Sequence, residues 1–118
     1  MTVTLRAGFG RAAITPQLGS PMAGYLARVK GAQGVHDQLS AHAAVFEQGP
    51  LRAAVLNLDL LEVTEEICRE IRRRAEGALG IPGDNLLICA THTHSGPAVS
   101  KKFGFDGNES TVDRIISG

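Results

Sequence analysis

Residues 51–90, LRAAVLNLDLLEVTEEICREIRRRAEGALGIPGDNLLICA, decide the fold. The apolar run over residues 51–60 predicts a strand, and the shorter run over residues 85–90 predicts another. Between them Thr64 is placed to cap the first turn of a helix, and Gly80 is placed to end its last turn. The apolar stripe of this helix is Ile67, Ile71, Ala75, Ala78 and Leu79. A strand, a helix and a strand in this order form a βαβ unit, whose two strands run parallel.

Two further strands extend this unit into a sheet. Residues 39–48 predict a strand that a short Gly-containing turn joins to the run over residues 51–60, which is a hairpin signal. The Gly- and Pro-rich residues 1–30 predict one short strand followed by irregular loop. The expected fold class is therefore α/β with a mixed, partly parallel sheet. The run over residues 51–60 is apolar almost throughout, which indicates a strand covered on both faces, and we expect residues 85–90 to form a central strand.

Composition excludes several classes of protein. The 118 residues suffice for one small domain, and 43% of them are apolar. Twelve basic and twelve acidic side chains cancel, so we expect no nucleic-acid partner. No stretch approaches the roughly 20 apolar residues of a membrane span, and no signal peptide is seen, so we expect a cytoplasmic protein without a transmembrane segment. Cys68 and Cys89 are interpreted as two buried free thiols, with a disulfide or a metal role as the alternative.

The residues best placed for chemistry follow the second strand of the βαβ unit. Ligands of such sheets bind beyond the carboxyl ends of the strands, and there residues 91–97 read THTHSGP. If strand geometry persists, His92 and His94 point to the same face and can address one site. Neutral imidazole is a common zinc ligand, and three protein ligands with a water make a hydrolytic centre. From spacing alone, two satisfied histidines at a strand end are the equal alternative.

Other polar residues have weaker claims. Asp59 ends the run over residues 51–60, where it either orients an imidazole of the site or caps the following helix. The pair His36 and Asp37 reads as a surface turn, and His42 inside a strand reads as structural. Ser95 follows a histidine but lacks the strand-turn-helix context of a nucleophile elbow, so we do not expect it to be a nucleophile.

Five motifs occur in order along the chain. They are Gly8-Phe9-Gly10-Arg11-Ala12-Ala13-Ile14-Thr15-Pro16, Met22-Ala23-Gly24-Tyr25, Gly34-Val35-His36-Asp37, Asp59-Leu60 and Thr91-His92-Thr93-His94-Ser95-Gly96-Pro97. Their order and spacing resemble the amino-terminal part of the neutral/alkaline non-lysosomal ceramidase family, and the THTHSGP string is the most specific of them. The resemblance implies hydrolysis of the amide of a ceramide-like lipid to a sphingoid base and a fatty acid, with one bound Zn2+ as cofactor.

The resemblance also assigns residues. In the family the first histidine of THTH binds zinc, which corresponds to His92, and the second, here His94, helps proton transfer or stabilises the developing oxyanion. By the same analogy His36 is a second catalytic candidate, and Gly24 and Tyr25 are substrate-binding candidates near the pocket. The implied chemistry is that of zinc acting as a Lewis acid while an imidazole carries a proton to the leaving amine.

The family completes its zinc site with a further His, a Glu and a Tyr from much later in a longer chain. We therefore expect residues 1–118 to be the amino-terminal part of a ceramidase-like catalytic domain, with little activity alone because the metal site is incomplete. Residues 111–116 predict the first turns of another helix. The alternative is a non-catalytic module that binds partners or self-associates through an unpaired sheet edge. A different metallohydrolase is the weaker third interpretation, because SGP follows the second histidine where an HxHxDH motif needs other residues.

Overall fold

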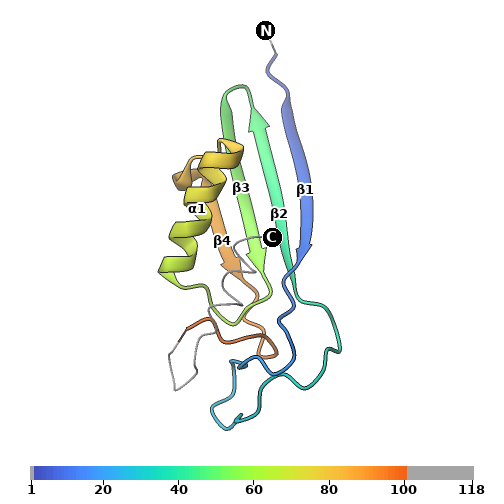
Figure 1. Cartoon of the computed structure of the whole chain (residues 1–118). Coiled ribbons are helices and arrows are strands. Elements are labelled where there is room, and N and C mark those ends of the chain that lie inside the picture. The colour runs from blue at the N-terminus through green and yellow to red at the C-terminus, as the bar shows by residue number, and fades with distance from the viewer. Residues whose placement is uncertain (1, 101–118) are drawn as a thin grey trace.

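The computed structural model describes residues 2–100 (Figure 1). Its elements are β1 (Leu5–Ala13), β2 (Ser40–Gln48), β3 (Leu51–Leu58), α1 (Glu65–Leu79), a 3-10 turn (Gly83–Asn85) and β4 (Leu86–Ala90). The strands form a sheet in the order β1-β2-β3-β4, in which β3 and β4 are parallel and the other neighbours are antiparallel. The expected α/β fold with a mixed sheet and a βαβ unit is confirmed. The helix predicted over residues 111–116 lies outside the described residues.

The strands follow the apolar runs closely. The β2–β3 hairpin pairs Gln48 with Leu51, and Gly49 between them has φ 57°, a left-handed conformation that glycine adopts without steric cost. β1 has nine residues and pairs with β2 along its whole length, so it is longer than the short strand expected. The hairpin and β1 therefore form a three-stranded antiparallel part of the sheet.

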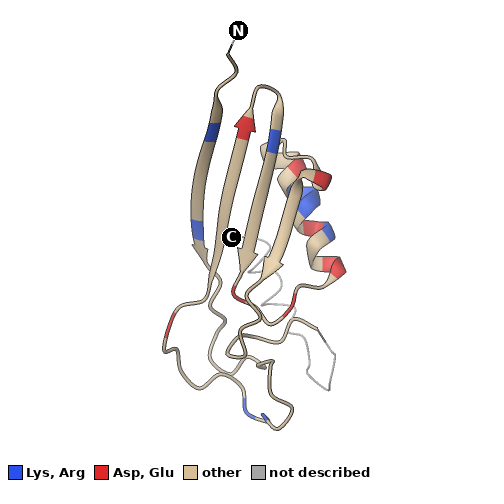
Figure 2. Ribbon diagram, turned by 180° about the vertical axis from the view of Figure 1, so that it is seen from behind, with Lys and Arg blue, Asp and Glu red and all other residues tan. Residues whose placement is uncertain are grey.

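The helix begins and ends where its sequence predicts. The Thr64 hydroxyl accepts a hydrogen bond from the Ile67 amide at 3.2 Å, and Gly80 takes the left-handed conformation, with φ 63°, that ends many helices. Figure 2 shows that most charged residues of the sheet-and-helix part belong to α1. Among them, hydrogen bonds from Arg73 and Arg74 lower the pKa of Glu70 to about 2. Arg73 and Arg74 therefore pair with a carboxylate of their own helix.

The core lies between α1 and one face of the sheet. One buried cluster joins the end of β3 to the start of α1 and to the loops, and consists of Ile14, Leu58, Leu60, Ile67 and Val99. A second, smaller cluster lies towards the other end of the helix and consists of Ala54, Ile81 and Leu86. Two members of the first cluster, Ile14 and Val99, lie in loops outside the strands and the helix. The cluster therefore connects the sheet to the region where the histidines lie.

Coverage of the sheet is one-sided, which corrects two expectations. β3 is not covered on both faces, because α1 packs on one face only and Leu51 on the strand is 66% exposed. β4 is an outer strand of the described sheet, where a central strand was expected. Ala78 and Leu79, which were assigned to the buried helix stripe, are exposed. Residues 2–100 therefore leave exposed several apolar side chains that their sequence pattern predicted to be buried.

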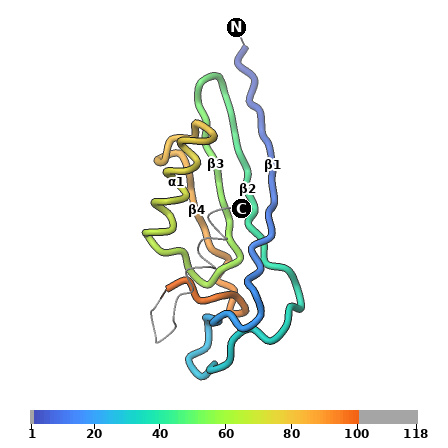
Figure 3. The backbone as a smooth tube through the Cα atoms, viewed as in Figure 1, coloured from blue at the N-terminus to red at the C-terminus, as the bar shows by residue number. Residues whose placement is uncertain are grey.

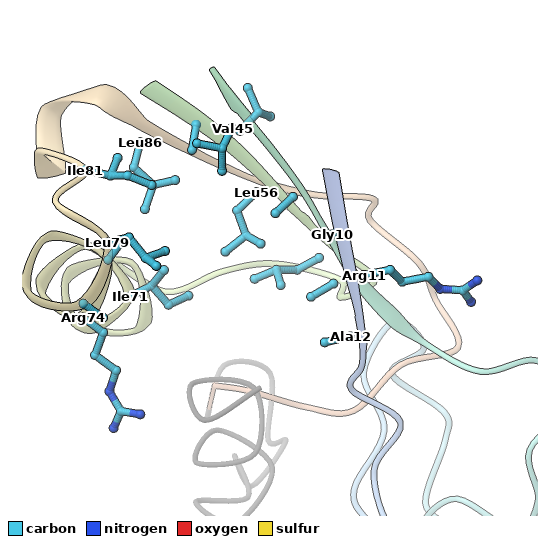
Figure 4. Close-up of a pocket in the computed structure, with 17 residues that line it drawn as sticks. Gly10, Arg11, Ala12, Val45, Leu56, Ile71, Arg74, Leu79, Ile81 and Leu86 are labelled. Atoms are coloured by element: carbon cyan, nitrogen blue, oxygen red, sulfur yellow. The ribbon is translucent and has the colours of Figure 1, made fainter. Parts of the chain in front are cut away.

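A groove of about 530 Å³ results from this partial cover (Figure 4). Its walls come from the inner face of α1, including Ile71 and Ala75, and from the sheet, including Ala43 and Leu56. The groove has no histidine, cysteine or carboxylate in its lining, so its residues offer neither a metal ligand nor a nucleophile. Across residues 2–100, no helix combines the length and the hydropathy that a membrane span requires.

Candidate active site at the carboxyl end of the parallel strands

The chain leaves the sheet at the end of β4. The Thr91 amide still donates to the Leu58 carbonyl of the neighbouring strand, at 3.0 Å. At His92 the backbone turns into the left-handed region, with φ 63°, which is uncommon for a residue with a side chain. Strand geometry therefore does not persist through the THTH motif, and the expected reason for the two histidines to share a face is wrong. Such strained residues cluster at functional sites, where the surrounding structure holds them.

The imidazole of His92 has a defined hydrogen bond. Its Nδ1 lies 2.8 Å from the carbonyl oxygen of Leu61, in the segment that leads from β3 to α1. A carbonyl only accepts, so Nδ1 must carry the proton in this bond. In the neutral ring Nε2 then holds the lone pair, and that is the arrangement found in histidines that bind metals through Nε2. His92 as a whole residue is exposed.

The imidazole of His94 is held in the same way by a different segment. Its Nδ1 lies 2.9 Å from the carbonyl oxygen of Gly24. Gly24 has φ 109°, and a Cβ at this position would come within 2.7 Å of the His94 Cα atom. Only glycine allows this approach, because a side chain would be strained by the φ angle and would collide with the histidine. The MAGY motif is therefore built around His94.

The rings of the site contact one another. The centroids of the His92 and His94 rings are 4.8 Å apart, with an interplanar angle of 83°. The ring of Tyr25 meets His94 edge-on, with the centroids 5.4 Å apart. Three of the five residues assigned to a site from sequence thus have rings in contact, and the Gly24 carbonyl completes the group. The structure brings together His92, His94, Gly24 and Tyr25.

Two loop segments far apart in sequence lie side by side at this end of the sheet, as the blue and orange-red parts of the tube show (Figure 3). Met22 and Pro97 form an isolated antiparallel bridge. Beside it the Ala23 amide donates to the Gly96 carbonyl at 3.0 Å, and the Ala98 amide donates to the Pro21 carbonyl at 2.8 Å. These backbone bonds fix the MAGY motif against the end of the THTHSGP motif.

Asp59 has a role that neither sequence interpretation anticipated. Its carboxylate accepts a hydrogen bond from the Ser40 amide at 2.9 Å, and its own amide donates to the Ser40 carbonyl at 3.0 Å. The Ser40 hydroxyl in turn accepts a bond from Nε of Arg11 at 2.9 Å. Asp59 therefore fastens the start of β2 to the end of β3, whereas an imidazole or the helix cap had been expected as its partner.

The remaining candidates lie apart from the ring cluster. His36 is on an exposed loop, where its Nδ1 lies 2.7 Å from a carboxylate oxygen of Asp37 and its side chain is 97% exposed. This matches the surface turn expected from the pair, and within residues 2–100 the ring contacts do not join His36 to His92 or His94. His42 lies within β2, as expected, with its side chain exposed. Ser95 is also exposed, and its amide donates to the Thr93 hydroxyl.

The donor set fits zinc in part. His92 and His94 present two neutral-type imidazoles with Nδ1 fixed by backbone carbonyls, which suits a nitrogen-binding metal. Within residues 2–100 there is no group of three or more His, Cys, Asp or Glu side chains that could hold a metal ion. Cys68 and Cys89 are free and half-buried, which confirms free thiols but not full burial. A catalytic zinc site normally takes three protein ligands, so these residues supply at most part of one.

Comparisons with known proteins agree with this fold. No protein-family model matches the sequence. Among solved structures, neutral ceramidase from Pseudomonas aeruginosa is 26% identical, with a TM-score of 0.85 over all of this chain and 20% of that chain. A structure of ceramidase complexed with C2 is also 26% identical, with a TM-score of 0.82 over 99% of this chain and 20% of the other. The described chain spans about a fifth of the length of these structures.

These neighbours confirm the resemblance found in the sequence. The chain has the fold of one part of neutral ceramidase, with the βαβ unit and the mixed sheet of that part. Sequence reasoning missed two features of the site. The Leu61 carbonyl, which holds His92, is a backbone group and leaves no sequence signal. Arg28, which contacts both loop segments, lies just after the MAGY motif and carried no spacing signal of its own.

Proposed function

We propose that this chain supplies the first part of the active site of a zinc-dependent amide hydrolase that acts on a ceramide-like lipid. The observation that supports it most directly is the pair of histidines, each held at Nδ1 by a backbone carbonyl, with ring centroids 4.8 Å apart. The likeness to ceramidase structures supports the substrate class. The remaining metal ligands are proposed to come from outside residues 2–100, because a hydrolytic zinc needs a third protein ligand.

Each residue has a distinct role in this proposal. His92 binds the metal through Nε2, and the Leu61 carbonyl at Nδ1 keeps the ring in the required tautomer. Zinc, when bound, supplies a Lewis acid for the amide carbonyl and makes water more acidic. His94 holds or moves a proton at Nε2, between the attacking water and the leaving amine. Tyr25 and the Gly24 backbone form the wall against which His94 is oriented.

His36 enters this proposal only as a prediction from the resemblance. Its side chain is 97% exposed beside Asp37, and among residues 2–100 the ring contacts do not join it to His92 or His94. The proposal for the other four residues does not depend on it. His36→Ala is accordingly a useful comparison variant in each experiment on the site.

The decisive experiment follows the histidine ring nitrogens while zinc chloride is added to the chain. With 15N-labelled histidine, we expect the Nε2 resonance of His92 to shift, and we expect saturation to require excess zinc because two imidazoles make a weak site. His92→Ala should abolish any response of the His94 resonances to zinc. His42→Ala, which removes an exposed histidine on a strand, should leave the shift of His92 intact. Zinc that shifts His36 or His42 and leaves His92 unmoved would falsify the proposal.

Hydrolysis of a short-chain ceramide is the second readout. We expect little turnover from the chain alone, since the described residues do not complete the ligand set. Zinc held with submicromolar affinity and lost in His92→Ala would instead mean that further ligands are present, from this chain or from a second copy. In that case amide hydrolysis should appear in the wild type and be absent in His92→Ala.

A second candidate function is a non-catalytic interaction module, and the uncovered face of the sheet favours it. Phe9 is 80% exposed, Leu5 is 62% exposed and Leu87 is 59% exposed on the face opposite α1. Large exposed apolar patches mark interaction surfaces, and the outer strands β1 and β4 offer edges for pairing. Sedimentation analysis tests this candidate, because self-association through this face should weaken in Phe9→Ser.

A further inference from the structure

Arg28 connects the two loop segments of the site through one nitrogen. Its Nη1 lies 3.1 Å from the carbonyl oxygen of Ala23 and 3.1 Å from the carbonyl oxygen of His94. The first acceptor directly precedes Gly24, whose own carbonyl holds the His94 ring. The guanidinium therefore binds the backbone of both loops beside the hydrogen bond that orients the His94 ring.

A tight turn brings Arg28 back over the site. The Arg28 amide donates to the Tyr25 carbonyl at 3.1 Å, which closes a four-residue turn. The guanidinium carbon then lies 4.8 Å from the centroid of the Tyr25 ring, within the range of a cation–π contact. Tyr25 in turn meets the His94 ring edge-on. Arg28 thus restrains the tyrosine as well as the backbone.

The charge of Arg28 is balanced by dipoles. The side chain is half-buried, and among residues 2–100 the ion pairs do not include it. Two backbone carbonyls and an aromatic face are its contacts. A half-buried cation with this set of contacts is held in one orientation, because Nη1 donates to both carbonyls while the guanidinium carbon lies over the ring.

We propose that Arg28 is a positioning residue for His94, an inference that rests on the proposed function of that histidine. Arg28 fixes the His94 carbonyl, the peptide before Gly24 and the ring of Tyr25, and through them it keeps the His94 imidazole with Nδ1 donating and Nε2 free for proton transfer. Lysine is not an equivalent replacement, because the guanidinium donates to both carbonyls from Nη1 while its delocalised charge stays over the ring, whereas an ammonium is a compact, strongly hydrated point charge.

The experiment measures the tautomer of each histidine in the 15N-histidine-labelled full chain. Two-bond 1H–15N spectra are recorded without metal, at a pH well above the ordinary imidazole pKa. In Arg28→Gln we expect the ratio of Nδ1–H to Nε2–H tautomer at His94 to fall about fivefold, the factor that one hydrogen bond is worth. His92, whose Nδ1 bond goes to Leu61, should keep its ratio. Arg28→Lys should lose as much as Arg28→Gln.

Arg69→Gln is the matched control, since it removes an exposed arginine of α1 that pairs with Glu65. It should change neither histidine. An unchanged His94 in Arg28→Gln, an equal change in both histidines, or full rescue by Arg28→Lys would each overturn the proposal. If Arg28→Gln fails to fold, Tyr25→Leu replaces it. A His94 tautomer ratio that is unchanged when the tyrosine ring is lost would overturn the proposal equally.

The measurement separates this inference from the proposed function. It uses no zinc. The expected change of the His94 tautomer in Arg28→Gln can therefore be observed even if zinc does not bind to His92. Conversely, zinc bound through His92 with a His94 ratio that does not respond to Arg28 would leave the metal proposal intact and remove the positioning role.

Discussion

Residues 40–90 are held by regular ladders and a packed core, whereas residues 14–39 and 91–100 are held by a few bonds between loops. In the first region β2, β3 and β4 pair in continuous register, and α1 packs its apolar stripe on one face. In the second region the contacts that orient the histidines are single: one isolated bridge, four carbonyls that accept from an imidazole or a guanidinium, and one glycine that leaves room for a histidine.

Stability and the candidate site thus depend on different parts of this chain. Burial of apolar side chains stabilises the sheet and helix and is shared by many residues. The loop end also buries Ile14, Ala98 and Val99, but the orientation of its histidines depends on geometry at a few positions, as functional loops on a rigid scaffold generally do. Substitutions of buried residues in the first region should therefore lower the free energy of unfolding, whereas substitutions in the second region should also change the hydrogen bonds of the histidines.

The largest effect is expected from Leu58→Ala. Leu58 is 1% exposed and belongs to the cluster that joins the sheet to the loops. Its truncation should lower the free energy of unfolding by about 3 kcal/mol, because a buried cavity remains. Urea denaturation measures this, with Leu87→Ala as control, since Leu87 is 59% exposed on the opposite face. Equal losses in the two variants would contradict the one-sided core.

Gly24→Ala should have the next largest effect, and it tests the packing of the loops without changing the sheet or the helix. A methyl group at Gly24 would meet the Cα and Cβ atoms of His94 in a backbone conformation that alanine rarely adopts. We expect a loss of about 2 kcal/mol in stability and loss of the Nδ1 bond of His94. Gly34→Ala is the control, because its position is open. Stability and tautomer unchanged in Gly24→Ala would show that the loops are not packed as described.

A smaller effect should distinguish His92→Gly from His92→Ala. Both variants remove the imidazole and its bond to Leu61, so only the backbone differs between them. The φ of 63° suits glycine, and we expect His92→Gly to be the more stable by about 0.5–1 kcal/mol after allowance for its greater unfolded-state entropy. Thermal unfolding of the two proteins side by side measures the difference. A more stable His92→Ala would mean that this turn is not strained.

The smallest effect concerns the surface of α1 and its response to pH. Arg73 and Arg74 lower the pKa of Glu70 to about 2 from an ordinary 4.5, so its stabilising contribution is full above pH 4.5 and is lost as the pH falls towards 2. The stability difference between wild type and Glu70→Gln should therefore shrink over that interval, and high salt should reduce it throughout. A difference independent of pH would argue against the ion pairs. The Glu70→Gln substitution should leave the histidine spectra unchanged.

Local sequence signals predicted most of the regular structure. The hairpin follows from two apolar runs around Gly49, and α1 follows from its period, from Thr64 at one end and from Gly80 at the other. Such signals act between residues close in sequence, so they survive without knowledge of the fold. The βαβ order then placed the THTH motif at the carboxyl end of a strand, next to the end of β3.

The α/β fold and the βαβ unit could be predicted from local sequence patterns, and four of the residues that meet at the site could be predicted from a resemblance that the ceramidase structures confirm. How these four residues meet could not be predicted in this way. Strand alternation had been expected to align His92 with its neighbour, but a left-handed turn and two carbonyls from distant loops orient the rings. The partner of Asp59, the exposure of His36 and the grip of Arg28 were likewise undecided. The physical reason is that these contacts join residues distant in sequence, often through backbone atoms that every residue carries, so no local pattern encodes them.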